Sequence, residues 1–261
     1  MKTAIVIPAR YGSTRFPGKP LALINGRSML SLVVDVAKTA AKNFKDVSVF
    51  VTTEDQRIAD HCAEIGAECI MTSVDCATGS DRVLEAIKKL KQKFDFIINL
   101  QGDAPFTPPE IITPLIALFL NNPKLEVITP AHQLRWEDLD ALRERKKETP
   151  LSGTTCIRGT DGFALWFSKN IIPSIRDEKK LRATDEKSPV WLHMGIYGYK
   201  PETLEKFTNL KQGRFEVYEG LEQLRFLENK IPVYVADVHA PLAKIHSGID
   251  SPEDLERVQK S

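Results

Sequence analysis

The stretch TAIVIP at residues 3–8 runs directly into the loop ARYGSTRFPGKP at residues 9–20. Its first part is short, apolar and rich in β-branched residues, a composition typical of a buried strand. The glycines and prolines of the second part end the strand and favour a turn. We therefore expect a buried strand over Thr3–Pro8, with a polar loop over Ala9–Pro20 at its carboxyl end.

Helix and strand patterns alternate along the chain beyond this loop. Apolar residues recur at helical spacing from Ser28 to about Ala41, and Ser28 is a candidate N-cap. The other elements predicted in this half are helices over Glu54–Ile65 and Asp81–Lys91, strands over Val47–Thr53, Glu68–Thr72 and Phe94–Leu100, and then a helix, a strand and a helix to about Arg145. This alternation predicts an α/β fold with a mainly parallel sheet and helices on both faces. Ligands bind such sheets beyond the carboxyl ends of the strands, where the loops after Pro8 and Leu100 lie.

The second half of the chain is less regular. The sequence predicts strands over Thr154–Ile157, Phe163–Phe167, Gly195–Tyr199 and Val233–Val238, a charged loop over Glu178–Ser188, a long helix over Phe215–Asn229 and a terminal helix over Pro252–Lys260. No internal repeat or low-complexity linker interrupts it. We expect one domain over residues 1–261, with a β-rich subdomain inserted at about residues 150–200.

Composition and charge exclude several classes of protein. Lys and Arg number 36 against 35 Asp and Glu, so no global field favours nucleic acid or an acidic membrane. The apolar runs are too short to span a bilayer, and the N-terminal run lacks the features of a signal peptide. The four cysteines have no CxxC spacing, which favours reduced thiols over a metal site. We expect a cytoplasmic protein with no nucleic-acid partner and no membrane insertion.

The loop over Ala9–Pro20 is a candidate phosphate-binding loop. It combines the cations Arg10, Arg15 and Lys19 with two hydroxyls and two glycines. Glycines allow backbone N–H groups to converge on an anion, while Arg and Lys neutralise a polyphosphate. The loop matches neither the Walker A pattern nor GxGxxG, so the ATPase and dinucleotide-binding classes lose support. The alternative is a solvated basic turn, but three cations at a strand's carboxyl end favour phosphate.

Two acidic residues are candidate metal ligands. Asp103 closes a buried strand, where an ionised carboxylate is costly unless it has a partner. Asp250 could return to the same sheet edge, and carboxylate oxygens suit Mg²⁺, which retains waters and binds substrate phosphate oxygens. The alternative is a turn cap for Asp103 and a helix cap for Asp250. For Asp250 taken alone, the cap is the better explanation.

Several motifs occur in order along nearly the whole chain. They are Pro8–Pro20, Gly79–Arg82, Gln101–Asp103 with Pro105, Ala164–Ser168, Arg176–Asp177, His193–Tyr199, Leu221–Arg225 and Ile249–Leu255. In sequence and order they resemble the 3-deoxy-manno-octulosonate (Kdo) cytidylyltransferases, also called CMP-Kdo synthetases. The resemblance implies a Rossmann-like nucleotide-diphospho-sugar transferase fold with a smaller β-rich patch for dimerisation and sugar binding. It also implies transfer of CMP from CTP to the anomeric hydroxyl of a 3-deoxy-2-keto sugar acid, with Mg²⁺, for bacterial lipopolysaccharide biosynthesis.

The resemblance also implies roles for individual residues. Arg10, Lys19, Asp103 and Asp250 would be catalytic, with Mg²⁺ held by Asp103 and Asp250. The nucleotide would be bound by Ala9, Arg10, Ser13, Arg15, Lys19, Gly79, Ser80, Arg82 and Gln101, and the sugar acid by Gln101, Arg176, His193, Tyr197, Glu222 and Gln223. A homodimer would form through the patch around Thr154–Tyr199. Without the family, His193 is more often structural, and Glu222 and Gln223 are helix-surface residues.

Two positions depart from the family pattern. The family usually continues Gln-Gly-Asp with Glu, where this chain has Ala104, and it usually has a Val-Lys strand at Thr154-Thr155. Both changes could alter the sugar pocket. Kdo, an amino-substituted Kdo and other octulosonic or nonulosonic acids therefore all remain candidate substrates. Two further hypotheses are a sugar-phosphate nucleotidyltransferase using another nucleotide and a non-catalytic nucleotide-binding paralogue.

Overall fold

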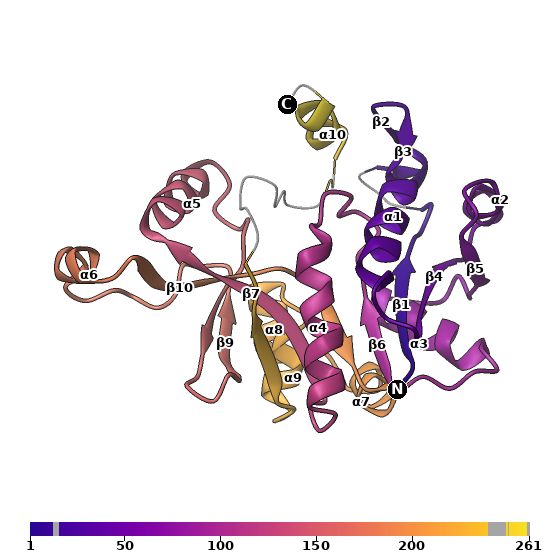
Figure 1. The fold of residues 1–261 in the computed structure, drawn as a ribbon. Helices are drawn as coiled ribbons and strands as arrows, with labels where there is room; N and C mark the ends of the chain where they lie inside the picture. Colours follow the sequence, from indigo (N-terminus) through magenta and orange to yellow (C-terminus); the bar gives the residue numbers. More distant parts are fainter. Residues whose placement is uncertain (13–15, 240–248, 250, 260–261) are drawn as a thin grey trace.

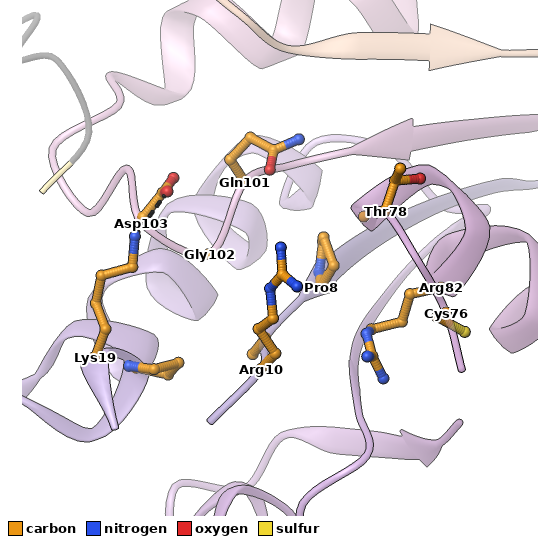
Figure 2. Close-up of a pocket in the computed structure, with 12 residues that line it drawn as sticks. Pro8, Arg10, Lys19, Cys76, Thr78, Arg82, Gln101, Gly102 and Asp103 are labelled. Carbon is orange, nitrogen blue, oxygen red and sulfur yellow. Dashed lines mark hydrogen bonds and ion pairs between the residues drawn. The ribbon is translucent and has the colours of Figure 1, made fainter. Parts of the chain in front are cut away.

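A parallel four-stranded sheet forms one half of the molecule (Figure 1). The computed structural model describes residues 1–12, 16–239, 249 and 251–259. The strand order in this half is β5 (Glu68–Met71), β4 (Val47–Thr53), β1 (Thr3–Pro8) and β6 (Phe96–Asn99), all parallel. Because β1 and β6 are parallel neighbours, the loops that follow them leave the sheet at the same edge (Figure 2).

The sheet continues through strands of mixed direction. Strand β11 (Tyr197–Tyr199) pairs antiparallel with both β6 and β7 (Val127–Arg135), while β12 (Val233–Asp237) runs parallel to β7. Beyond β7 the order is β10 (Lys187–His193), β8 (Thr155–Arg158) and β9 (Ala164–Ser168). These last three strands fall within the β-rich range expected at about residues 150–200. Their separation as a subdomain stays a prediction.

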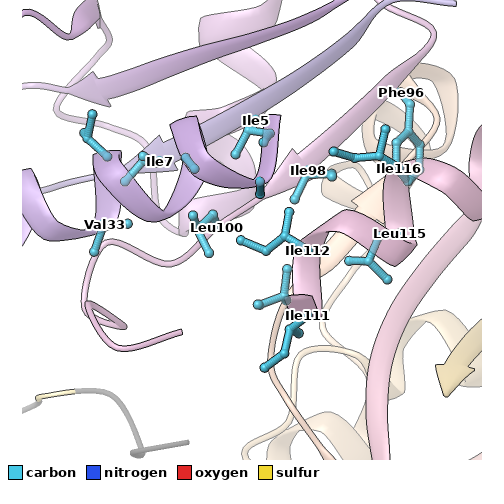
Figure 3. Close-up of a cluster of buried hydrophobic side chains, with 14 of the residues drawn as sticks. Ile5, Ile7, Val33, Phe96, Ile98, Leu100, Ile111, Ile112, Leu115 and Ile116 are labelled. Carbon is cyan, nitrogen blue, oxygen red and sulfur yellow. The ribbon is translucent and has the colours of Figure 1, made fainter. Parts of the chain in front are cut away.

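Helices cover both faces of the parallel half. Alternate residues of β1 supply the two faces: Ile5 and Ile7 pack in one buried cluster, and Ala4 and Val6 in another. Helices α1 (Met29–Ala41) and α4 (Pro109–Asn121) contribute to the first cluster (Figure 3), and α3 (Gly79–Lys89) and α7 (Pro201–Thr208) to the second. A strand buried on both faces fits the continuous apolar run of the sequence. The α/β prediction is confirmed.

Helix caps fix where two of these elements begin. The Ser28 hydroxyl accepts a hydrogen bond from the backbone N–H of Ser31 at 3.0 Å, so the predicted cap of α1 is confirmed. Helix α3 begins at Gly79, two residues earlier than expected, because Thr78 and Asp81 form a capping box. The first turn of α3 lies against the end of β1, where a Cβ atom at Gly79 would be 3.5 Å from Pro8 Cγ. Among the described residues, no helix has the length and apolar character needed to cross a membrane.

The expectation of a charged loop over Glu178–Ser188 is wrong. The segment forms helix α6 (Glu178–Thr184) and the start of β10, an interior strand between β7 and β8. The charges pair instead of remaining solvated: Arg143, on α5 (Trp136–Glu148), donates to both carboxylate oxygens of Glu178 at 2.9 and 2.8 Å. Arg182 of α6 donates to Asp140 of α5 at 3.0 Å. Ion pairs between elements distant in sequence therefore order this segment.

The expectation of one long helix over Phe215–Asn229 is also wrong, because the segment forms two short helices. Helix α8 (Arg214–Glu219) ends at Gly220, whose φ of 61° is left-handed, and α9 (Leu224–Glu228) follows after a turn. Glycine adopts this conformation readily and commonly ends helices. A buried ion pair between Glu216 and Arg225 joins the two helices. Glu222 consequently lies in the turn between them.

The remaining elements lie near the N-terminal loop and the C-terminal end of the chain. They are α2 (Gln56–Glu64), the 3-10 helix η1 (Lys19–Leu21), the two-stranded hairpin β2 (Leu23–Ile24) and β3 (Arg27–Ser28), and α10 (Pro252–Gln259). Helix α10 packs near β2, where the Gln259 amide donates to the Leu23 carbonyl at 2.9 Å. Helix α10 therefore lies at the same end of the molecule as the β2–β3 hairpin (Figure 1).

Candidate active site

Two adjoining cavities open beyond the carboxyl ends of β1 and β6. The first, here the β1 cavity, has a volume of about 260 Å³ and is lined by Pro8, Ala9, Arg10, Lys19, Pro20, Cys76, Thr78, Gly79, Arg82, Gln101, Gly102 and Asp103. The second, the β11 cavity, has a volume of about 440 Å³ and extends toward β11 and the α8–α9 turn. Gln101 and Asp103 line both cavities. A ligand in one cavity would therefore meet a ligand in the other at these two residues.

Two predicted cations of the N-terminal loop reach the β1 cavity. Lys19 Nζ lies 3.0 Å from Asp103 Oδ2, with both side chains partly buried. The exposed Arg10 side chain stands between this pair and Arg82 (Figure 2) and has no hydrogen bond or ion pair with the described residues. Arg10 is thus available to a phosphate. Ser13 and Arg15 lie outside the described residues.

Gly102 brings the two loops of the β1 cavity into direct contact. A Cβ atom at this position would lie 2.7 Å from the carbonyl oxygen of Pro8, at the end of β1. That separation is shorter than side-chain carbons tolerate, so only glycine allows the backbone of the β6 loop to approach β1 this closely. The approach places Asp103 within reach of Lys19.

The first turn of α3 forms another wall of the β1 cavity. Gly79 and Arg82, which the resemblance assigned to the nucleotide, both line it, but the Arg82 guanidinium already contacts Glu54 and Thr72, at 2.8 Å each. Ser80 does not line this cavity. Its hydroxyl donates to Glu222 Oε2 at 3.2 Å. Ser80 thus links α3 to the wall of the β11 cavity.

The neighbour of Asp250 lies against Asp103. The backbone N–H of Ile249 donates to the carbonyl oxygen of Asp103 at 2.9 Å. The Ile249 side chain is buried in a small apolar cluster with Ile24 and Met29, against which Phe16 and Phe106 pack. Asp250 itself lies outside the described residues, and within the described part no group of three or more His, Cys, Asp or Glu is placed to hold a metal.

The β11 cavity brings together most of the residues predicted for the sugar acid. Gln101, His193, Tyr197, Glu222 and Gln223 all line it. Their sequence positions are far apart, so only the fold could unite them. Arg176 is different, because it is exposed in the turn before α6 and is absent from the walls of both cavities.

His193 is held by a buried hydrogen-bond network. Its Nε2 lies 2.9 Å from both Thr129 Oγ1 and Tyr197 Oη, and its Nδ1 accepts a bond from the Gly195 N–H at 3.4 Å. The Thr129 hydroxyl donates to the Ile196 carbonyl, so Nε2 carries the proton and donates to Thr129. Burial lowers the pKa of His193 to about 3. The ring is therefore neutral and positions Tyr197.

This neutral histidine predicts a loss of stability in acid. The folded state disfavours the protonated ring, so His193 contributes stability above its ordinary pKa of 6.5, and this contribution falls as the pH drops toward 3. At pH 5 the loss is about 2 kcal/mol. Urea unfolding at pH 7 and pH 5 measures it, with His193→Gln as the variant that lacks the titrating ring. Equal losses in the two proteins would contradict a buried neutral His193.

Glu222 offers a hydrogen-bond acceptor to the β11 cavity. Burial raises its pKa, and its Oε1 atom is buried without a hydrogen bond, 3.9 Å from Arg225 Nη2. A buried polar atom without a partner is costly and calls for an explanation. A substrate hydroxyl donating to Oε1 would satisfy it.

The cavities also contain residues that the sequence did not identify. Asn99 and Tyr199 line the β11 cavity, and Cys76 and Thr78 line the β1 cavity. The period of two along β11 could have indicated Tyr199, which follows Tyr197 on the same face. Arg145, in the last turn of α5, also lines the β11 cavity. No signal in that charged segment distinguishes it from its neighbours.

Comparison with known proteins agrees with this arrangement. The family model described as cytidylyltransferase matches residues 4–236. The 3-deoxy-manno-octulosonate cytidylyltransferases of Maricaulis maris and Elusimicrobium minutum are 43% and 36% identical to this chain, each over 99% of it and over 96% and 97% of their own lengths. The structure of a CMP:2-keto-3-deoxy-manno-octonic acid synthetase complexed with CTP matches with a TM-score of 0.83 at 33% identity, covering 100% of this chain and 98% of that one. Similarity at this level over the full length shows that the chain is an enzyme that belongs to the cytidylyltransferase family and, within it, to the 3-deoxy-manno-octulosonate cytidylyltransferases.

Proposed function

We propose that this enzyme transfers CMP from CTP to the anomeric hydroxyl of Kdo or a close analogue, releasing pyrophosphate, in lipopolysaccharide biosynthesis. The observation that carries the proposal is the pair of cavities that meet at Gln101 and Asp103. The β1 cavity has the cations that a triphosphate needs, and the β11 cavity has hydroxyl, amide and carboxylate groups suited to a polyol. The names of the relatives and the CTP complex of the similar structure support the same reaction.

The two cavities divide the work of the reaction. The anomeric hydroxyl attacks the α-phosphorus of CTP, so negative charge develops on the phosphoryl oxygens and the pyrophosphate. Arg10 and Lys19 place positive charge beside the β1 cavity, where it stabilises that charge. Glu222 and Gln223 accept and donate hydrogen bonds that orient the sugar hydroxyls. The reacting groups then meet beside Gln101 and Asp103.

Mg²⁺ is the proposed cofactor, held by Asp103 and Asp250. The chemistry of Asp103 fits, because a partly buried carboxylate at the junction of the cavities already attracts the cation Lys19. The Ile249–Asp103 backbone bond brings the chain next to Asp250 to the same place. Mg²⁺ takes few protein carboxylates and completes its shell with water and phosphate oxygens. When bound, it supplies charge that neutralises the triphosphate.

The proposed assembly is a cytoplasmic homodimer. The four cysteines are free, which fits a reducing compartment. The β-rich patch exposes Leu165, 62% accessible, and the next residue, Trp166, packs edge-on against the exposed Phe215 of α8; exposed apolar side chains of this kind favour a partner surface. Light scattering of the purified protein tests the dimer. A monomer at micromolar concentration would contradict it.

The departures from the family pattern bear on the choice of sugar acid. Ala104 and Thr154 both line the β11 cavity. Thr155 instead is buried, and its hydroxyl donates to the Asn170 carbonyl at 2.7 Å. It therefore supports the strand next to the cavity and does not face the cavity. Small neutral residues leave room at these positions. A sugar acid whose substituents differ from those of Kdo therefore remains a candidate substrate.

A pyrophosphate-release assay tests the proposed function. Purified enzyme receives CTP, Mg²⁺ and a panel of octulosonic and nonulosonic acids, some of them amino-substituted. We expect release only when CTP, an acid and Mg²⁺ are all present, and no release after chelation of the metal. Preference for UTP or dTTP with a sugar phosphate would favour a sugar-phosphate nucleotidyltransferase instead. CTP binding without turnover on any acid would favour a non-catalytic paralogue.

A further inference from the structure

Arg145 is a cation without an assigned role at the β11 cavity. It lies in the last turn of α5, is exposed and contributes to the cavity wall. Its guanidinium makes no hydrogen bond or ion pair with the described residues. Its neighbours behave differently: Arg143 is paired with Glu178, and Lys147 with Glu144. Arg145 is therefore free to receive an anion from the cavity.

The charged groups of the β11 cavity favour such a role. Asp103 and Glu222 both line it, and His193 is neutral there. Among the described residues of the wall, Arg145 is the only Lys or Arg. A sugar acid entering this cavity carries a carboxylate. Asp103 is already paired with Lys19 of the adjoining β1 cavity, so Arg145 is the unpaired cation of the described wall. Arg176, which the resemblance placed among the sugar-acid residues, lies outside the wall.

The chain around Arg145 is fixed in place. Lys146 donates from its ammonium group to the carbonyl oxygens of Ser152 and Lys169, the latter at 2.6 Å, and burial lowers its pKa. The Thr149 N–H bonds to the Arg145 carbonyl at 3.0 Å. These bonds anchor the end of α5 and the turn that follows it. Lys146 is thus a positioning residue for Arg145.

Gly153 gives the guanidinium its place against the cavity wall. Its φ is 71°, a conformation that favours glycine, and a Cβ atom there would lie 3.6 Å from Arg145 Nη2. The guanidinium consequently lies beside the Gly153 backbone, between α5 and the Thr154 wall. Its remaining N–H donors have the fork geometry that binds a carboxylate through two parallel hydrogen bonds.

We propose that Arg145 binds the carboxylate of the sugar acid and so selects acids over neutral sugars. This role rests on the proposed function, because it requires a sugar acid in the β11 cavity. It adds a specificity residue to the enzyme and assigns carboxylate recognition to α5.

Steady-state kinetics with Arg145→Ala and Arg145→Lys test this role. We expect Arg145→Ala to raise KM for the acid by about 10- to 100-fold with KM for CTP nearly unchanged, as loss of a charge-assisted pair predicts. Arg145→Lys should recover part of this loss, because it retains the charge but not the fork. Lys147→Ala, on the same helix but paired with Glu144, is the matched control and should behave as wild type.

A substrate analogue separates carboxylate binding from a general effect on the cavity. The methyl ester of Kdo lacks the negative charge, so wild type should prefer the acid strongly and Arg145→Ala should prefer it little. An equal preference for the acid over the ester in wild type and Arg145→Ala would overturn the proposal. So would a preference that is lost in Arg176→Ala but kept in Arg145→Ala.

Calorimetric titration of Kdo into each protein measures binding without turnover. Weaker Kdo binding to Arg145→Ala than to wild type supports the role even if the measured turnover is low, and equal binding opposes it. Absence of both binding and turnover of every acid in wild type would instead overturn the proposed function, and this inference with it.

Discussion

Asp103→Asn is expected to lower kcat by about 1000-fold, because the change removes a charge at the point where the two cavities meet. The amide retains the shape of the side chain but binds Mg²⁺ weakly and no longer pairs with Lys19. The carboxylate is partly exposed, so its loss should change Tm by only a few degrees. Pyrophosphate release and thermal unfolding, measured on the same preparation, give the two values.

Asp35→Asn is the matched control for that variant. Asp35 is also paired with a cation, Arg27, but both side chains are exposed and away from the cavities. We expect full activity from this control. Turnover by Asp103→Asn within about tenfold of wild type would show that the Asp103 carboxylate contributes little to stabilising the transition state.

Gly102→Ala is expected to separate the loops that follow β1 and β6. The added methyl group would lie 2.7 Å from the Pro8 carbonyl oxygen, which belongs to the backbone and cannot rotate away. Overpacking of this kind costs about 1–3 kcal/mol of stability. The same displacement moves Asp103 relative to Lys19 and Arg10, so we expect kcat/KM to fall by about 100-fold.

Measurement below the unfolding transition distinguishes the two effects of this substitution. Circular dichroism first establishes the temperature at which Gly102→Ala is fully folded, and activity is then assayed there. If activity at that temperature equals that of wild type, the close approach at Gly102 serves stability alone.

The sequence predicts the first half of the fold well because local patterns decide it. The run Ile5–Ile7 and the helical spacing after Ser28 specify their own elements, and parallel order then follows from the alternation. The second half depends on contacts between distant residues. The charges of Glu178 and Arg182 indicate a solvated loop until their partners on α5 are known, and Gly220 ends a helix within a pattern that continues through it.

The candidate site divides in the same way. Arg10, Lys19 and Asp103 could be predicted because they follow buried strands whose carboxyl ends share one edge. The resemblance identified His193 and Glu222, which the structure brings to one cavity. Arg145 could not be predicted, because its neighbours Glu144 and Lys147 have the same charged character and only the turn at Gly153 brings it to the wall.

The bond between Ile249 and the Asp103 carbonyl has a consequence for biosynthesis. The paired strands β1, β4, β5 and β6 all lie within the first 99 residues, so they can pair before the second half of the chain has been made. The loop at Asp103 acquires its Ile249 partner only after β12 and the following segment have been made. Pairing of the parallel strands can therefore precede the contact that joins Ile249 to the Asp103 loop, so this part of the candidate site forms last.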